Sequence, residues 1–264
     1  MKLVKPTVQL IAYPKINWSG LSEALVEQTG SETAWFDRMV REDIPSAEAL
    51  VEFGGRECYK SWEPGLNPNV TKVREDSKAY LGNILESGHG SVLEHANFSF
   101  TFSNVSRVFT HEFVRHRAGV AVSQESMRYV RLDDIPFWFP DWALQDAELL
   151  ERLTQHVKQS EYLQFWMAKH FDLDNPLVPF GEKKAKTSFM RRFAPGGHAT
   201  HMLATINVRA LRHIIAMRTN IHAEEEIRIV CDQLAEITLA EVPNLMQDYH
   251  RNENAEWIPD FLKV

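Results

Sequence analysis

The chain is poor in cysteine, with only two in 264 residues. Cys58 and Cys231 stand far apart and form no CxxC pair, so the sequence predicts reduced thiols rather than a disulfide framework. The start of the chain shows no secretory leader, and we therefore expect a cytoplasmic protein. Neither cysteine lies beside a histidine or in a basic segment that would favour a reactive thiolate, so we interpret both as packing residues.

Long apolar runs and an excess of positive charge are also lacking. No stretch approaches the roughly 20 apolar residues that a membrane-spanning helix needs. The formal net charge of −7 creates no general attraction for nucleic acid or for an acidic membrane surface. We therefore expect neither a nucleic-acid partner nor a membrane partner. The chain has no P-loop, no GxGxxG motif and no internal repeat.

The remaining composition is that of an ordinary globular protein, with 44% hydrophobic and 25% charged residues. The length predicts a single domain over 1–264. Phe98, Phe100 and Phe102 alternate with polar residues, which predicts a half-buried strand. Another strand is expected at 8–13, and the other periodic segments are predicted to be helices, at 20–29, 46–58, 72–87, 143–171 and 200–218. The result is a helix-dominated α/β chain with one modest sheet.

One segment, RHRAGVAVSQESMRY at 115–129, concentrates cationic groups in an otherwise acidic chain. A helix predicted at 105–113 would deliver Arg115, His116 and Arg117 at its C-terminal end, where the helix dipole favours cations. The guanidinium group is a planar fork of donors that fits phosphate and carboxylate. The motif therefore indicates a site for a phosphorylated, planar ligand, although a solvated basic loop is the alternative.

The segment TINVRALRHIIAMR at 205–218 carries a second candidate surface. At about 100° per residue, Asn207, Leu211, Ile214 and Arg218 fall on one stripe of a helix, polar at both ends and apolar between. An aromatic ring lying on the apolar middle could reach both polar ends. The alternative is a core helix with a polar residue at each margin. We expect Asn220 to cap the following helix, which begins with three glutamates.

Histidines gather in HGSVLEH at 89–95 and in HATH at 198–201. Histidine and glutamate bind zinc, but neither segment has the spacing of a recognised metal site. We predict no metal centre, and expect these histidines to form hydrogen bonds to a ligand or to the core.

Taken together, these segments resemble the flavin-dependent thymidylate synthases. The resemblance is carried by GRECY at 55–59, ESGHGSVLEHANFSFTFSNVSRVFTHEFVRHR at 86–117, SQESMRY at 123–129, RRFAP at 191–195 and TINVRALRHIIAMRTNIHAEEEIR at 205–228. RHR followed by SxRY is the signature of that family. Residues 1–50 and 143–190 match it weakly.

The resemblance implies a fold, a reaction and an assembly. The fold is a helix-rich single domain around a modest, mainly antiparallel sheet, and the enzyme is a homotetramer with active sites shared between subunits. FAD serves the reductive methylation of dUMP to dTMP, with methylenetetrahydrofolate as the carbon donor and NADPH as the reductant.

The resemblance also assigns residues to ligands. The FAD-binding residues it implies are His89, Ser91, Glu94, Arg115, His116, Arg117, Gln124, Asn207, Val208, Arg209 and His213. The dUMP-binding residues it implies are Glu112, Arg115, Gln124, Glu125, Ser126, Met127, Arg128, Arg191 and Arg218. Arg218 falls on the arginine that activates the uracil ring, and is the predicted catalytic residue.

Two features depart from the family pattern. Eight residues separate RHR from Ser126, where the family usually has seven, which leaves the roles of Ser123, Gln124 and Glu125 open by one position. Glu112 stands where the family often has glutamine. A carboxylate there would repel a phosphate unless it faces the N–H groups of the base.

The chemistry of the residues agrees with the implied reaction. Carbon 5 of uracil is a poor nucleophile, and without a suitable thiolate it can be activated by stabilising negative charge on the pyrimidine. A positioned guanidinium does this. The competing interpretation is a non-catalytic nucleotide- or RNA-binding module that uses the same arginines, which predicts salt-sensitive polyanion binding and no flavin.

Overall fold

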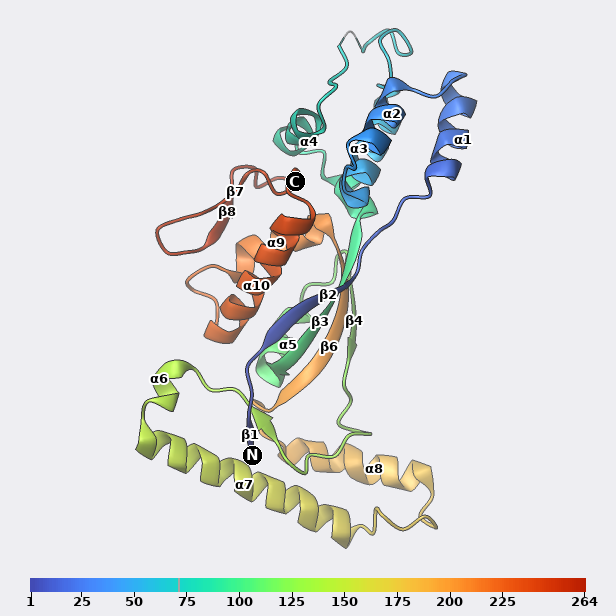
Figure 1. Ribbon diagram of the computed structural model, residues 1–264. Coiled ribbons are helices and arrows are strands. Elements are labelled where there is room, and N and C mark those ends of the chain that lie inside the picture. Colours follow the sequence, from blue (N-terminus) through green and yellow to red (C-terminus); the bar gives the residue numbers. More distant parts are fainter. Residues whose placement is uncertain (71) are drawn as a thin grey trace.

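A four-stranded antiparallel sheet forms the centre of the computed structural model, which describes residues 1–70 and 72–264 (Figure 1). Its strands lie in the order β2-β3-β6-β4. Their bounds are β2 Thr7–Ala12, β3 Asn97–Ser106, β4 Val120–Gln124 and β6 Ala199–Asn207. The α/β architecture and the antiparallel sheet agree with the sequence prediction, whereas the single domain stays a prediction.

The strand predicted around Phe98, Phe100 and Phe102 is confirmed as part of β3. All three rings are buried, while the polar residues between them stay half-buried on the opposite face. Three helices supply the other side of this core: α5 Arg107–Phe113, α9 Val208–Arg218 and α10 Glu225–Glu241. Alternating side chains therefore give the sheet one face that is packed and one that is partly open.

The helix predicted over 200–218 is wrong in its first half. Residues 199–207 form β6, because Met202, Ala204 and Ile206 are buried and alternate with more exposed residues, which is the period of a strand. The helix begins only at Val208, where the Asn207 side chain accepts a hydrogen bond from the Ala210 N–H at 2.8 Å.

Other predicted boundaries move to the nearest capping residue. The helix expected at 72–87 is α4 Ser77–Glu86, capped by Asp76. The helix expected at 143–171 is divided by its cap Asp146 into α6 Asp141–Leu144 and α7 Ala147–His170. Glu224, not Asn220, caps α10. In each case the side-chain carboxylate accepts a hydrogen bond from a free backbone N–H of the first turn. The apolar periodicity used for the sequence prediction does not indicate which residue caps a helix.

The first part of the chain builds a separate aromatic cluster beside the main core. Helices α1 Trp18–Thr29, α2 Ala34–Arg41 and α3 Ser46–Tyr59 lie together at one end of the sheet (Figure 1). Trp35 and Trp62 are buried there with Leu25, Met39 and Ala49. Cys58, on α3, is exposed and does not pack as predicted, whereas Cys231 is buried in the main core.

The remaining elements lie at the edges of the molecule. Helices α7 and α8 Phe180–Met190 lie at the opposite end of the sheet from α1 (Figure 1). The short elements are β1 Lys2–Leu3, β5 Pro136–Phe137, β7 Tyr249–Arg251, β8 Trp257–Pro259 and the 3-10 turns η1 Gly90–His95 and η2 Arg191–Phe193. Within the described ranges, no helix is long and apolar enough to cross a membrane.

Two buried polar contacts join elements that are distant in the sequence. Arg212 of α9 forms a bidentate ion pair with Asp248, at 2.7 and 2.8 Å, which holds the segment before β7. Glu226 of α10 accepts hydrogen bonds from the backbone N–H and the hydroxyl of Ser106. Because the Ser106 side chain also accepts from the Phe109 N–H, Glu226 fixes the residue that begins α5.

Replacing Glu226 by alanine should therefore destabilise the protein more than an ordinary surface substitution. The change leaves the buried Ser106 N–H without its charged acceptor, and we expect a loss of about 2–3 kcal/mol in the free energy of unfolding. Denaturant unfolding measures it. The control Glu236→Ala removes an exposed ion pair of the same helix and should cost about 0–1 kcal/mol. Equal losses would contradict the role of Glu226.

Candidate functional site

The C-terminal ends of α5 and α9 meet at Arg218. Its Nε donates to Nε2 of His116 at 2.9 Å, and its Nη1 donates to the carboxylate of Glu112 at 3.0 Å. Its Nη2 also reaches the backbone carbonyl of Glu112 at 3.4 Å. The side chain of Arg218 is 13% exposed, so these contacts hold a nearly buried cation in one orientation.

His116 is a neutral imidazole at this junction. Burial lowers its pKa from 6.5 to about 4, and the positive charges of Arg218, His213 and Arg115 act in the same direction. Because Nε2 accepts from Arg218, the ring proton is assigned to Nδ1. His116 also meets the ring of His213 edge-on, with 5.9 Å between centroids. Two neighbouring imidazoles therefore form one wall of a cleft.

This cleft, of about 580 Å³, lies between the loop after α5 and the first turns of α9. It is lined by Arg115, His116 and Arg117 from the loop, by Asn207, Arg209 and His213 from α9, and by Glu94 of η1. The sequence prediction that these groups share one ligand surface agrees with this placement. Such a volume and such a mixture of cationic and ring-bearing groups suit a large phosphorylated, planar ligand.

Gly119 closes the loop against α9 and requires the absence of a side chain. Its φ is +69°, and a Cβ at this position would lie 2.3 Å from Nδ2 of Asn207. The Asn207 N–H donates to the Gly119 carbonyl at 3.0 Å. The loop that carries the RHR motif is therefore attached to the cap of α9 by its own backbone.

The rim of the cleft carries one more ion pair, and a polar atom without a protein partner lies outside its lining, just before η1. Arg209 donates to Glu94 at 2.7 Å, and both side chains are about half exposed. His89, just before η1, has a buried Nδ1 that finds no partner among the described residues. Such a rim offers cationic and hydrogen-bonding partners to a ligand with a diphosphate and polar edges.

Two of the predicted nucleotide residues, Glu112 and Gln124, line a second cleft, of about 500 Å³. Gln124 lines it and donates to Thr110 of α5 at 2.8 Å. Arg107 lines it as well and was not predicted from the sequence. Burial and the charge of Arg191 lower the pKa of Arg107, so the two guanidinium groups lie near each other. The sequence feature that could have indicated Arg107 is its position directly after Ser106, the residue that caps α5.

Strand β4 settles the position of Gln124 in the longer loop. β4 pairs with β6, with Ser123 opposite Leu203 and Gln124 opposite Met202. Since side chains alternate along a strand, Gln124 shares the packed face with buried Met202 and contacts α5, while Ser123 lies on the open face. Glu125 follows, and its backbone carbonyl accepts from Arg107 at 3.2 Å.

Several predicted residues lie elsewhere. The side chain of Val208 is fully buried in the core and its N–H donates to the Ala96 carbonyl, so it does not line the flavin cleft. Leu211 is also buried, so no ring can lie on it as the helical stripe suggested. Arg128 donates to Ser188 of α8 at 3.1 Å. Ser188 stands three residues before Arg191 in the sequence. The lining of the two clefts also leaves out His89, Ser91, Glu125, Ser126, Met127, Arg191 and Arg218.

The other candidate chemical groups are engaged or inert. His198 is buried, with Nδ1 at 2.6 Å from the Pro195 carbonyl, and the described part of the chain contains no group of three potential metal ligands. Burial raises the pKa of the Cys231 thiol to about 12, which keeps it protonated. The clefts therefore depend on arginine, histidine and amide groups.

Comparisons with known proteins point to one family. The family described as "Thymidylate synthase complementing protein" matches residues 38–244. Relatives named "Flavin-dependent thymidylate synthase" in Mycobacterium bovis and Mycobacterium tuberculosis are 36% identical to this chain over 212 residues, which cover 78% of this chain and 81% of the relative. The relative with the same name in Mycobacteroides abscessus is 37% identical over 214 residues, with the same coverage.

The depressed pKa of His116 predicts a pH-dependent stability. The unfolded chain takes up a proton near the ordinary value of 6.5, whereas the folded chain takes it up only near about 4. The contribution of the His116 imidazole to the free energy of unfolding is therefore complete above the pKa of the unfolded chain, 6.5. It is lost as the pH falls from 6.5 toward about 4. Chemical denaturation at several pH values should show a shallower decline for His116→Gln than for the unmodified chain. The control His156→Gln, in exposed α7, should keep the original slope, and equal slopes for all three proteins would contradict the assignment.

Proposed function

Because the chain belongs to the flavin-dependent thymidylate synthase family and is an enzyme that uses a flavin, we propose that it converts dUMP to dTMP. In this proposal the flavin is FAD, methylenetetrahydrofolate donates the carbon and NADPH is the reductant. The observation that carries the proposal is the placement of Arg218, which is fixed by Glu112 and His116 between the two clefts.

The cleft between the RHR loop and α9 is the proposed flavin site. Arg115 and Arg117 would hold the diphosphate, since their guanidinium groups are exposed in the cleft and the chain offers them no carboxylate partner among the described ion pairs. Asn207, Arg209 and His213 would contact the flavin from the start of α9, and Glu94 from the turn η1. Bound flavin supplies the electrons for the reductive methylation.

The cleft at Glu112 is the proposed dUMP site. Arg107 lines this cleft and the positive charge of Arg191 acts on it, which suits a phosphate, while Arg128 donates to Ser188 of α8. Gln124 projects from β4 on the same face, and Glu125, Ser126 and Met127 continue the chain beside it. Glu112 is turned toward Arg218, which keeps its carboxylate paired rather than opposed to the phosphate.

Arg218 is the proposed catalytic residue. A guanidinium held beside the pyrimidine would stabilise negative charge on the ring and so make carbon 5 a better nucleophile, without a covalent enzyme nucleophile. Its two neighbours favour this role, because neutral His116 accepts from Nε and leaves the arginine charge intact. Glu112 fixes the orientation of the other side of the guanidinium group.

We also propose the homotetramer that the sequence indicates. The far end of the molecule exposes a cluster of large apolar side chains on α7 and around α8, with Tyr162 70%, Phe165 50%, Trp166 49%, Phe180 68% and Phe189 47% exposed. The polar face of the sheet is also partly open. Surfaces of this kind are typical of subunit contacts, and both clefts are open enough to receive groups from a neighbouring subunit.

Replacing Arg218 by alanine should slow the chemical step far more than it affects folding. We expect dTMP formation to fall at least ~100-fold, as for the loss of one preorganised electrostatic stabiliser, while the protein still binds flavin and oxidises NADPH. Arg218→Lys should recover little, because an ammonium group cannot bond His116 and Glu112 as a planar fork does. Single-turnover dTMP formation with pre-reduced enzyme measures the effect.

The control for this experiment is Arg152→Ala, which removes an exposed arginine of α7 and should leave the rate unchanged. A near-normal rate in Arg218→Ala would contradict the catalytic role, and would show that Arg218 only complements the dipole at the end of its helix.

The phosphate assignment gives a separate prediction. Arg191→Ala should weaken dUMP binding by about 1.5–3 kcal/mol, because it removes a charge-assisted contact, and Arg128→Ala should act in the same direction. Flavin absorbance should persist in both variants. Equilibrium titration with dUMP and with FAD measures the two affinities, and a loss of FAD affinity at normal dUMP affinity would reverse the assignment.

A further inference from the structure

A third cavity, of about 520 Å³, lies at the N-terminal helices, away from the two clefts. It is lined by Trp35, Arg38 and Arg41 of α2, by Arg56 of α3, and by residues of the segment from Trp62 to Glu75. It shares no lining residue with the flavin cleft or with the cleft at Glu112. Its volume is that of a small-molecule site.

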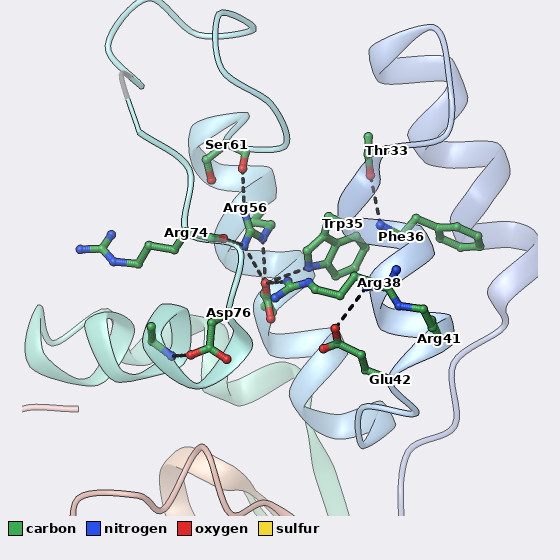
Figure 2. A network of polar contacts seen from close by, with 12 residues as sticks. Thr33, Trp35, Phe36, Arg38, Arg41, Glu42, Arg56, Ser61, Arg74 and Asp76 are labelled. Carbon is green, nitrogen blue, oxygen red and sulfur yellow. Dashed lines mark hydrogen bonds and ion pairs between the residues drawn. The ribbon is translucent and has the colours of Figure 1, made fainter.

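The floor of this cavity holds more positive than negative charge. The carboxylate of Glu52, which is completely buried, accepts on one oxygen from Arg38 at 3.0 Å and from Arg56 at 2.7 Å, and also from the indole of Trp35 at 2.9 Å (Figure 2). Arg56 is 1% exposed and Arg38 11% exposed at the side chain. One carboxylate therefore faces two guanidinium groups that are shielded from water, and a buried charge without a counter-charge is costly.

The nearest buried carboxylate does not supply the missing charge. Glu48 lies one turn before Glu52 on α3 and is also completely buried. Its two oxygens accept from the backbone and the side chain of Asn244, each at 2.7 Å, which directs them away from the arginines. Burial raises the pKa of Glu48, and the charge of Glu52 adds to this effect, so its charged form is disfavoured.

Two hydrogen-bond donors of the cavity lining have no acceptor. Arg56 is fully used, since it also donates to the carbonyls of Ser61 and Arg74 (Figure 2). Nη1 of Arg38 and Nε1 of Trp62 are buried, and no described residue accepts a hydrogen bond from either. Trp62 is 3% exposed. Oε2 of Glu52 is also buried without a partner among the described residues, so donors outnumber acceptors by one. An orphaned buried donor costs about 1–3 kcal/mol, and the excess of donors indicates a missing acceptor.

We infer that this cavity binds a small aromatic carboxylate. Its two oxygens would accept from Arg38 and Trp62, and its single charge would balance the second guanidinium. Its ring would lie against the indoles of Trp35 and Trp62, whose centroids are 5.1 Å apart. Asp37, Glu63 and Glu75 also line the cavity and pair with no arginine among the described ion pairs, so a doubly charged phosphate is disfavoured.

Calorimetric titration of the full chain, saturated with FAD, tests this inference with benzoate as the probe. Benzoate should bind with a saturable heat by about 10 mM, well above a millimolar dissociation constant. Benzamide has the same shape without the charge and should not bind measurably. Inorganic phosphate tests whether charge alone is sufficient, and should bind more weakly than benzoate. Equal binding of benzoate and benzamide, or none of benzoate, would overturn the inference.

Two variants separate a binding site from a structural cluster. Arg38→Met keeps the bulk of the side chain, and Glu52 still pairs with Arg56 and Trp35, so the protein should fold. This variant, and Trp62→Phe, should each weaken benzoate binding by about tenfold or more, as for one lost hydrogen bond to a charged group. The matched control Arg41→Met removes a 73% exposed arginine of the same helix and should bind as the unmodified chain does.

The same titrations exclude the alternatives. If all three variants bind benzoate equally, the heat comes from another place and the inference fails. If phosphate binds more tightly than benzoate and depends on Arg38, the cavity is a phosphate site and the carboxylate assignment is wrong. None of these outcomes depends on dTMP formation, so the result is independent of the proposed reaction.

Discussion

The antiparallel ladder between β3 and β6 determines where both clefts can form. It pairs Asn97 with Asn207 at one end and Ser106 with Ala199 at the other. Each strand leads directly into a helix, α5 after Ser106 and α9 after Asn207, so the two helices start at opposite ends of the sheet and run toward each other. At about 1.5 Å per residue, neither helix spans the roughly 33 Å of a ten-residue strand. Their C-terminal ends therefore meet over the middle of the sheet, at Arg218.

The electrostatics of that meeting point follow from burial and proximity. A nearly buried arginine requires fixed acceptors, and the α5 end supplies a carboxylate and an imidazole nitrogen. Burial, together with the cations around His116, lowers the pKa of the imidazole and keeps it neutral, which makes it an acceptor rather than a competing charge.

Helix α3 separates two cores and carries a line of buried charge between them. Glu48, Glu52 and Arg56 recur every four residues and so lie on one face of the helix. Glu48 reaches Asn244 beside the main core, while Glu52 and Arg56 face the aromatic cluster of the N-terminal helices. Among the described ion pairs, the single carboxylate of Glu52 pairs with two arginines, Arg38 and Arg56. By contrast, Arg212 and Asp248 form a pair of one cation and one anion.

Local patterns in the sequence were sufficient for the strand of alternating phenylalanines and for the position of the RHR motif after a helix. They failed where apolar periodicity is ambiguous, as at 199–207, because a short apolar run fits a strand as well as a helix until its pairing partner is known. Only tertiary structure decided that Arg107 lines the cleft at Glu112, that Arg128 donates to Ser188 of α8 and that Val208 is buried. Each of these facts depends on contacts between residues far apart in the chain, and the spacing of residues along one segment carries no information about such contacts.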